Sequence, residues 1–278
     1  MQQKIRYNNL SNVAELRKIV RAFYKKNARP LPWRENTDPY WVMVSEIMLQ
    51  QTQVSRGLVK FPEFISKFPT LASLAQATTP EVLAAWQGLG YNRRALFLKR
   101  TAELIVAHHA GEVPRDIETL KRFPGIGPNT AASILAFAYN IPNAFIETNV
   151  RTVFLHHFFA GEENISDAQL MPLIAEALDR VHPREWYWAL MDYGTHLKKQ
   201  HKNPSRRSRH HTVQTKFEGS LRQIRGKILK ILLIEDDLTT EELATRADRE
   251  LRQTQRAIDQ LVDEKFLYAN DGRYSLVK

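Results

Sequence analysis

Residues 121–150 read KRFPGIGPNTAASILAFAYNIPNAFIETNV, and the order of elements in this stretch is the main indication of the architecture. It opens with a proline-glycine turn over 124–127 that leaves little room for side chains, and an amphipathic segment over 130–139 follows. A Gly-x-Gly turn that leads into a helix directs consecutive backbone N–H groups outward, which suits a phosphate and reads no bases. Four residues are therefore candidate phosphate contacts, although such a turn can also be only a tight connection: Gly125, Gly127, Asn129 and Thr130.

A single carboxylate follows the amphipathic segment. Glu147 comes after a short connection over 140–143, and Asn149 lies two residues further on. A fixed carboxylate can stabilise positive charge that develops on a reacting group, and it can orient or activate water. Glu147 is therefore a candidate catalytic residue, with Asn149 orienting the carboxylate or a phosphate. The alternative is that Glu147 only faces the positive end of the next helix.

The net charge of +10 is confined to one segment of the 278-residue chain. Residues 198–230 contain 11 Lys and Arg residues and one acid, so the remainder of the chain is neutral. Localised positive charge favours a polyanion, because each neutralised phosphate releases counterions. Arg206, Arg207 and Arg209 are the candidate contacts to a nucleic acid, and the alternative is a solvated basic linker.

The composition excludes several classes of protein. The chain has no cysteine, which rules out disulfides, thiolate-bound zinc and cysteine-held iron–sulfur clusters. It contains no run of 18 apolar residues, and the N-terminal sequence MQQKIRYNNL lacks the apolar core of a signal peptide. We expect a cytoplasmic, monomeric protein with no cofactor, no bound metal and no membrane partner.

The first 200 residues carry no alternating strand pattern and are predicted to be all helical. The segment 29–34, RPLPWR, contains two prolines and is expected to be extended rather than helical. The segment 40–51 is apolar on most sides, as in a buried helix, so its polar residues Ser45, Glu46 and Gln50 are informative. Helices are predicted, with Asn9 or Ser11 as the first cap, over 9–27, 40–51, 54–66, 70–75, 80–86, 92–109, 116–122, 130–139, from 150, over 167–181 and over 186–197.

The pattern changes after residue 217, where three amphipathic helices are predicted: over 221–233, from 239 and over 250–264. The segment 266–277 then alternates around an Asn-Asp-Gly turn, which is a strong hairpin signal. Three helices followed by a hairpin resemble a winged helix, a fold that serves DNA binding and protein dimerisation alike. The predicted domains are a helical domain over 1–197, a basic loop over 198–216 and a winged helix over 217–278.

Five motifs in the helical domain resemble those of the helix-hairpin-helix DNA glycosylases, and within them the MutY-type adenine glycosylases and their thymine-mismatch relatives. The resemblance covers roughly residues 29–196, and its motifs are LPWR at 31–34, SEIMLQQT at 45–52, WQGLGY at 86–91, FPGIG at 123–127 and MDYG at 191–194. It implies a mainly α fold with two helical subdomains and a cleft between them. It also implies a base-excision-repair enzyme that flips a base out of duplex DNA and hydrolyses its N-glycosidic bond.

The resemblance assigns roles to residues in these motifs. Glu46 matches the glutamate that protonates the departing base, although a buried glutamate can also cap a neighbouring helix. Glu147 stands where the family has a catalytic aspartate, which is one methylene shorter. Gln51 matches the residue that wedges into the base stack when a base is flipped. Its neighbours Gln50 and Thr52 are expected to contact DNA as well.

Three departures from the family pattern affect the expected chemistry. Asn129 stands where lyase-active relatives such as endonuclease III carry a Schiff-base lysine, so we expect a monofunctional glycosylase. Asn92 follows Tyr91 where adenine glycosylases often have a second tyrosine, and both residues are candidate DNA contacts. The four cysteines that hold an iron–sulfur cluster in the family are absent after Gly194, which indicates a clusterless variant whose basic loop faces the phosphates.

The expected partner is double-stranded DNA that contains a mismatch or a damaged base, and the expected substrate is adenine in a mismatch. Thymine or uracil in a mismatch is an alternative, because the thymine-mismatch relatives can also carry a glutamate at the position of Glu46. A non-catalytic DNA-binding descendant is the second class, because Glu147 departs from the family's aspartate. A bacterial protein of this kind would be associated with the nucleoid.

Several other side chains have competing interpretations. Four histidines could form a metal site, but their loose spacing favours a solvated loop: His196, His201, His210 and His211. Three tryptophans favour core positions over base stacking: Trp33, Trp41 and Trp86. Arg34 could hold a phosphate or pair with Glu46.

Overall fold

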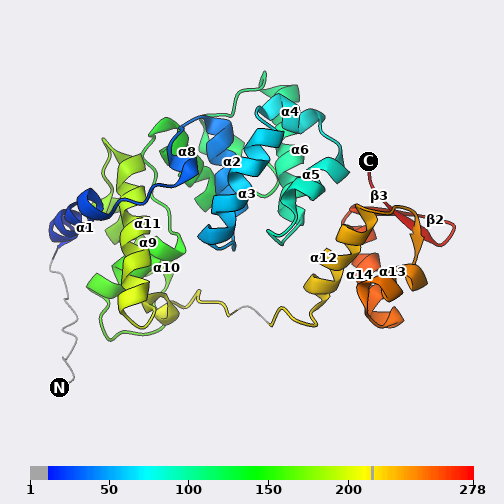
Figure 1. Ribbon diagram of the computed structural model, residues 1–278. Coiled ribbons are helices and arrows are strands. Elements are labelled where there is room, and N and C mark those ends of the chain that lie inside the picture. The colour runs from blue at the N-terminus through cyan, green and yellow to red at the C-terminus, as the bar shows by residue number, and fades with distance from the viewer. Residues whose placement is uncertain (1–11, 214–215) are drawn as a thin grey trace. The chain divides into compact units, whose positions relative to one another are not determined.

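The computed structural model of the protein describes residues 12–213 and 216–278. The chain divides into two compact units, which are formed by Met1–Met43, Arg115–Arg122 and Ile126–Val213, and by Val44–Pro114, Phe123–Gly125 and Gln214–Lys278. Figure 1 shows mainly helices, with the strands of the described residues near the C-terminus. The predicted mainly α class is therefore confirmed. Among the described residues, no helix is long and apolar enough to cross a membrane.

The first unit is built around α9 (Thr148–Phe158) and α11 (Pro183–Gln200), which pack against each other (Figure 1). The helix α11 also packs against α1 (Val13–Asn27), whose Leu16 and Val20 are completely buried. The other elements of this unit are η1 (Pro32–Arg34), α7 (Ile117–Leu120), α8 (Pro128–Tyr139), α10 (Asp167–Ala177) and η2 (Pro204–Arg207). The hairpin of the sequence motif lies between α7 and α8.

The helix α2 (Pro39–Leu49) leads from the first unit into the second. Its successors in the second unit are α3 (Val54–Lys67), α4 (Leu71–Gln76), α5 (Thr79–Trp86) and α6 (Arg93–His108). The helix α6 packs against both α4 and α5. Thr70 and Thr78 begin α4 and α5 with capping boxes, which satisfy backbone N–H groups that have no partner inside the helix.

The C-terminal segment has the element order of a winged helix. Its elements are α12 (Leu221–Leu232), β1 (Leu238–Thr239), α13 (Thr240–Ala247), α14 (Leu251–Asp263), β2 (Leu267–Asn270) and β3 (Arg273–Leu276). The strands form an antiparallel sheet in the order β1-β3-β2. The three helices and the hairpin were expected from the sequence, whereas the two-residue strand β1 was not.

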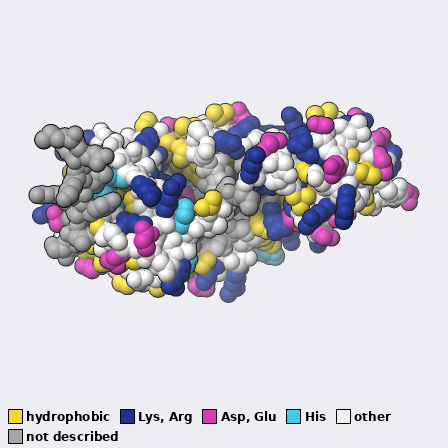
Figure 2. Space-filling model, turned by 90° about the horizontal axis from the view of Figure 1, so that it is seen from below, with side chains coloured by type: hydrophobic (Ala, Val, Ile, Leu, Met, Phe, Trp, Pro, Cys, Tyr) yellow, Lys and Arg dark blue, Asp and Glu magenta, His cyan; other side chains and the backbone are white. Residues whose placement is uncertain are grey.

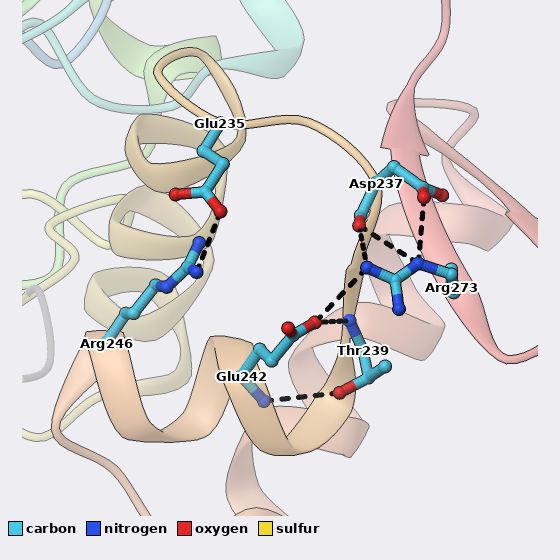
Figure 3. Close-up of polar contacts among 6 residues, drawn as sticks. All are labelled: Glu235, Asp237, Thr239, Glu242, Arg246 and Arg273. Atoms are coloured by element: carbon cyan, nitrogen blue, oxygen red, sulfur yellow. Dashed lines mark hydrogen bonds and ion pairs between the residues drawn. The ribbon is translucent and has the colours of Figure 1, made fainter.

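A polar network joins β3 to the start of α13 (Figure 3). The Nε of Arg273 donates to Oδ2 of Asp237 at 2.8 Å and to the backbone carbonyl of Asp237 at 3.1 Å. Glu242 accepts from the backbone N–H of Thr239 at 2.8 Å, and its own N–H donates to the Thr239 hydroxyl at 3.3 Å. These side chains are therefore engaged in contacts within the C-terminal segment.

The structure corrects several predicted boundaries. The segment 29–34, expected to be extended, contains the short 3₁₀ helix η1, because proline is compatible with the first position of a helical turn. The helix predicted over 167–181 ends at Ala177, and the helix predicted from 186 begins at Pro183. Asn12 caps α1, whereas the candidate caps Asn9 and Ser11 lie outside the described residues.

Candidate functional site

Glu46 lies on α2, and the apolar character predicted for this helix agrees with its burial. Val44, Ile47 and Met48 are completely buried, whereas Glu46 is half-buried. Glu46 is therefore a half-buried side chain on an otherwise largely buried helix, and its role as a general acid stays a prediction.

The turn after α2 carries the predicted wedge. Gln51 is exposed and has a φ of +52°, a left-handed conformation that is uncommon for a residue other than glycine. Gln50 reaches the hairpin, where its Nε2 donates to the carbonyl of Gly125 at 3.2 Å. The Thr52 hydroxyl accepts a hydrogen bond from Arg94 at 3.0 Å. This turn and the end of the hairpin are thus joined directly.

A second turn, before α6, carries Tyr91 and Asn92. Tyr91 also has a left-handed conformation, with a φ of +47°, and both residues are half-buried. The indole N–H of Trp86 donates to the carbonyl of Gly90 at 3.2 Å, which anchors the turn to α5. Tyr91 and Gln51 are therefore both held in sparsely populated backbone conformations, a feature that tends to mark functional sites.

Most candidate phosphate contacts of the hairpin are exposed, as a contact with the phosphate backbone of DNA requires. Gly125, Gly127 and Asn129 are exposed, and Thr130 is half-buried. Gly125 has a φ of +76°, and an added Cβ would lie 3.1 Å from the Cβ of Phe97, so a side chain would be strained there on both grounds. The hairpin is suited to an approaching phosphate backbone.

Glu147 is the N-cap residue of α9, yet within the described chain its side chain makes no capping hydrogen bond. Burial raises the pKa of the Glu147 carboxyl, and the nearby Arg151 partly opposes this shift. Arg151 forms a two-pronged ion pair with Asp167, with distances of 2.7 and 2.8 Å. The Oδ1 of Asn129 accepts a long hydrogen bond of 3.4 Å from the N–H of Ile146 and so helps to place the residue before Glu147.

Asn149 lies two residues after Glu147, and its backbone packs closely against α11. Its backbone is so near Gly194 that a Cβ added to that glycine would lie 2.4 Å from the Asn149 carbonyl oxygen. Among the described residues, the buried Oδ1 of Asn149 has no hydrogen-bond partner. A buried acceptor without a donor is costly, so this oxygen is suited to a donor on an incoming group or an ordered water.

The three candidate arginines of the basic loop differ in their surroundings. Arg206 and Arg209 are exposed, and the Nε of Arg209 makes a long contact of 3.4 Å with the side chain of Asn164. Arg207 is half-buried and donates to the carbonyls of Phe159 and, at 2.6 Å, Leu155. It therefore caps the end of α9. On the face shown in Figure 2, Lys and Arg side chains lie at many places with Asp and Glu among them.

Of the four histidines considered from the sequence, His196, His210 and His211 are exposed, whereas His201 is half-buried and belongs to a cluster of histidine rings. The ring of His201 packs 4.7 Å from that of His156, and His156 packs 4.8 Å from His157. The Nε2 of His157 forms a 2.9 Å hydrogen bond with the hydroxyl of Tyr193. Burial lowers the pKa of both His156 and His157 to about 4. Within the described residues, no group of three or more His, Cys, Asp or Glu is arranged to hold a metal ion.

Arg34 pairs with Asp192, a partner that was not considered from the sequence. Its two terminal nitrogens each lie 2.9 Å from a different oxygen of Asp192. The Nε of Arg29 and its backbone N–H also donate to this carboxylate, at 2.6 and 2.9 Å. Trp33 and Trp86 are buried core residues, as predicted, and Trp41 is half-buried.

The comparison with known proteins agrees with this geometry. Residues 44–179 match the HhH-GPD superfamily of base excision DNA repair proteins. The adenine DNA glycosylase of Mycobacterium tuberculosis is 32% identical over 286 residues, which cover 92% of this chain and 91% of that protein. The chain belongs to the HhH-GPD superfamily. The assignment to the helix-hairpin-helix DNA glycosylases that was made from the sequence is confirmed.

Further similarities fit the same superfamily. The adenine DNA glycosylase of Mycolicibacterium smegmatis is 33% identical over 281 residues and is covered to 94% of its length. A thermostable thymine-DNA glycosylase has a similar structure, with a TM-score of 0.59, 22% identity and coverage of 66% of this chain and 85% of that one. An endonuclease III bound to DNA has a TM-score of 0.55 at 15% identity, with the same coverage. The structural similarities show the HhH-GPD fold.

Proposed function

We propose that this HhH-GPD protein is an adenine DNA glycosylase that acts as a monomer on mismatched double-stranded DNA. The similarity to the two mycobacterial adenine DNA glycosylases over nine-tenths of the chain is the observation that carries this proposal. The residues that would carry the reaction stand at the matching motif positions, Glu46 on α2 and Glu147 at the start of α9. The enzyme would work in the cytoplasm, at the nucleoid of a bacterial cell.

In the proposed reaction, the bond between the sugar and adenine breaks and a water oxygen bonds to the sugar carbon. This water keeps one hydrogen in the new hydroxyl group and releases one proton, which replaces the proton that Glu46 gives to the base. Glu46 would give its proton to the departing base, so that the base leaves as a neutral molecule. Glu147 would stabilise the positive charge that develops on the sugar. Burial disfavours the Glu147 anion before the reaction, so the developing cation would be stabilised more strongly than the ground state.

Two substitutions test these roles. Glu147→Gln and Glu46→Gln should each slow single-turnover excision of adenine by about a hundredfold or more, while the dissociation constant for DNA stays nearly constant. Glu118→Gln is a suitable control, because Glu118 lies exposed on α7 and pairs with Lys121. Excision by Glu147→Gln at the wild-type rate would remove that residue from the mechanism.

We propose that the enzyme is monofunctional, because Asn129 offers no amine at the position of the lyase nucleophile. The expected product is an abasic site in an intact strand, which becomes a break only after alkali. Borohydride should trap little covalent complex. Efficient trapping that persists after the nearby lysines are replaced would refute this part of the proposal.

Thymine or uracil in a mismatch is the second candidate substrate. One reason to test this candidate is the structural similarity to a thymine-DNA glycosylase. Another reason is Asn92, which stands where adenine glycosylases often have tyrosine. A panel of duplexes with each mismatch and with common damaged bases would distinguish them, with strand cleavage by alkali as the readout. Excision of thymine or uracil but not adenine would favour the second candidate, and no excision at all would indicate a non-catalytic descendant.

A further inference from the structure

Arg94 is a buried cation that the sequence motifs did not single out. It is the second residue of α6 and is only 8% exposed. Its side chain donates to six oxygen acceptors, and none of them is a carboxylate: the carbonyls of Ile47, Met48, Gln50, Leu89 and Gly90, and the hydroxyl of Thr52. A buried charge is costly unless it is paired or hydrogen-bonded. Both terminal nitrogens of Arg94 are hydrogen-bonded to these acceptors, whereas its Nε has no partner among the described residues, so the two groups of acceptors hold the charge.

The acceptors belong to the two turns described above. The Nη1 of Arg94 donates to the carbonyls of Ile47 and Met48, near the end of α2, and to that of Gln50. Its Nη2 donates to the Thr52 hydroxyl and to the carbonyls of Leu89 and Gly90. The carbonyl of Gln50 directly precedes Gln51, and the carbonyl of Gly90 directly precedes Tyr91.

Arg94 thus holds the peptide that precedes the left-handed residue of each of these two turns. Gln51 and Tyr91 have φ values of +52° and +47°. Such conformations persist only where the surroundings over-determine them. The carbonyl of a peptide group changes direction when the next residue changes φ, so two fixed carbonyls restrict both residues at once.

We propose that Arg94 is the positioning residue that locks the turn of Gln51 and the turn of Tyr91 into one rigid element for base flipping. The proposal rests on the proposed function for its consequence in catalysis, but the rigid coupling itself is a property of the free protein. If the two turns enter the base stack together, they must keep a fixed spacing, and one guanidinium sets that spacing.

Arginine suits this task better than lysine. The planar guanidinium presents donors in two directions, whereas an ammonium group is a single point. The guanidinium also lies 5.4 Å from the ring centroid of Trp86 and 5.6 Å from that of Tyr91, at cation–π distance. Burial lowers the pKa of Arg94 to about 10, so the group remains charged at neutral pH.

The first test uses the free protein and needs no substrate. In Arg94→Lys, amide hydrogen exchange over 50–52 and over 89–91 should become faster by about tenfold in both turns together. Arg100→Met is the matched control, since Arg100 lies exposed on the same helix and pairs with Glu103. It should leave both turns as they are. Faster exchange in only one turn, or in neither, would overturn the coupling.

The second test measures excision from two substrates. Arg94→Lys should slow single-turnover excision of adenine from a mismatched duplex by about a hundredfold, because a misplaced wedge loses a large factor in rate. Excision of an adenine opposite an abasic site should change by less than about threefold, because flipping that base requires less unstacking. An equal loss on both substrates would indicate a general structural role and contradict the proposal.

A milder substitution covers the case in which Arg94→Lys does not fold. Thr52→Val removes one acceptor of Nη2 and leaves the charge in place. Thr52→Val should speed amide hydrogen exchange in both turns and change the ratio of the two excision rates. Both effects should have the same direction as in Arg94→Lys and be smaller. If wild-type protein excises adenine from neither substrate, the proposed function fails, whereas the exchange result still decides the role of Arg94.

Discussion

His156 and His157 are neighbouring histidines of α9 that the folded chain keeps neutral. They are 8% and 3% exposed, and within the described residues the Nδ1 of each has no hydrogen-bond partner. After burial, the charges that lower the pKa of His156 are those of His201 and of Arg207, which caps the same helix. The charges that lower the pKa of His157 are those of His156 and His201. Protonation would therefore place a new positive charge in a buried, already positive environment.

We predict that stability falls in acid because of these two residues. Between the ordinary histidine pKa of 6.5 and the lowered pKa of about 4, the unfolded chain binds protons that the folded chain does not. Above pH 6.5 the two histidines therefore do not lower the free energy of unfolding. As the pH falls toward 4, the free energy of unfolding decreases by up to about 3 kcal/mol for each histidine. Urea unfolding at a series of pH values would measure it.

The matched variants for this prediction are His156→Phe and His211→Phe. The first removes one buried titrating ring and should flatten the fall in stability between pH 6.5 and 4. The second changes an exposed histidine and should leave the slope unchanged. Equal slopes in all three proteins would show that other groups cause the acid sensitivity.

At the scale of elements, the close approach of α11 to α9 depends on Gly194. We predict that Gly194→Ala destabilises the protein by about 1–3 kcal/mol, because the added methyl group meets the backbone of Asn149 rather than a movable side chain. The displaced start of α9 carries Glu147, so excision should slow as well. Gly226→Ala is the control: Gly226 lies inside α12, and its added Cβ meets no atom within 4 Å.

The basic loop gives a second prediction at this scale. Arg206→Gln with Arg209→Gln should weaken binding to every duplex about equally, and should flatten the salt dependence by roughly one slope unit for each phosphate that the variant no longer neutralises. Arg207→Gln should instead lower stability, because its guanidinium caps the end of α9. Fluorescence titrations at several salt concentrations would measure binding. An unchanged affinity and salt slope would mean that the loop does not bind DNA.

Local signals made most elements predictable, whereas long-range partners were not. Apolar spacing, prolines and capping threonines such as Thr70 and Thr78 delimit the helices within a few residues. The motif positions placed Glu46 and Gln51 on α2 and on the turn after it. The pairing of Arg34 with Asp192 joins residues 158 apart, and Arg94 binds mainly backbone carbonyls, which have no signature in the sequence. The only sequence sign of the histidine cluster was the adjacent pair at 156–157.

At the scale of the whole molecule, the C-terminal segment 217–278, which is part of the second compact unit, is predicted to be unnecessary for the chemical step. The proposed catalytic residues all precede it, and its own apolar residues, among them Ile228, Leu243 and Ile258, are completely buried. A protein that ends at residue 216 should keep its single-turnover excision rate at saturating enzyme within about threefold, while its affinity for DNA falls. A collapse of that rate in a folded, DNA-bound truncation would contradict the prediction.

The ion pair between Arg29 and Asp192 also bears on how the nascent chain folds during translation. The two residues are 163 positions apart, and α11, which carries Asp192, is also the helix that covers α1. A ribosome that adds about 5–20 residues per second needs roughly 10–30 s to travel that distance. During this interval Leu16 and Val20 of α1 lack their final neighbours, so the growing polypeptide exposes the apolar face of an amphipathic helix. The first unit can close only after the helices of α3 to α6 have already been synthesised.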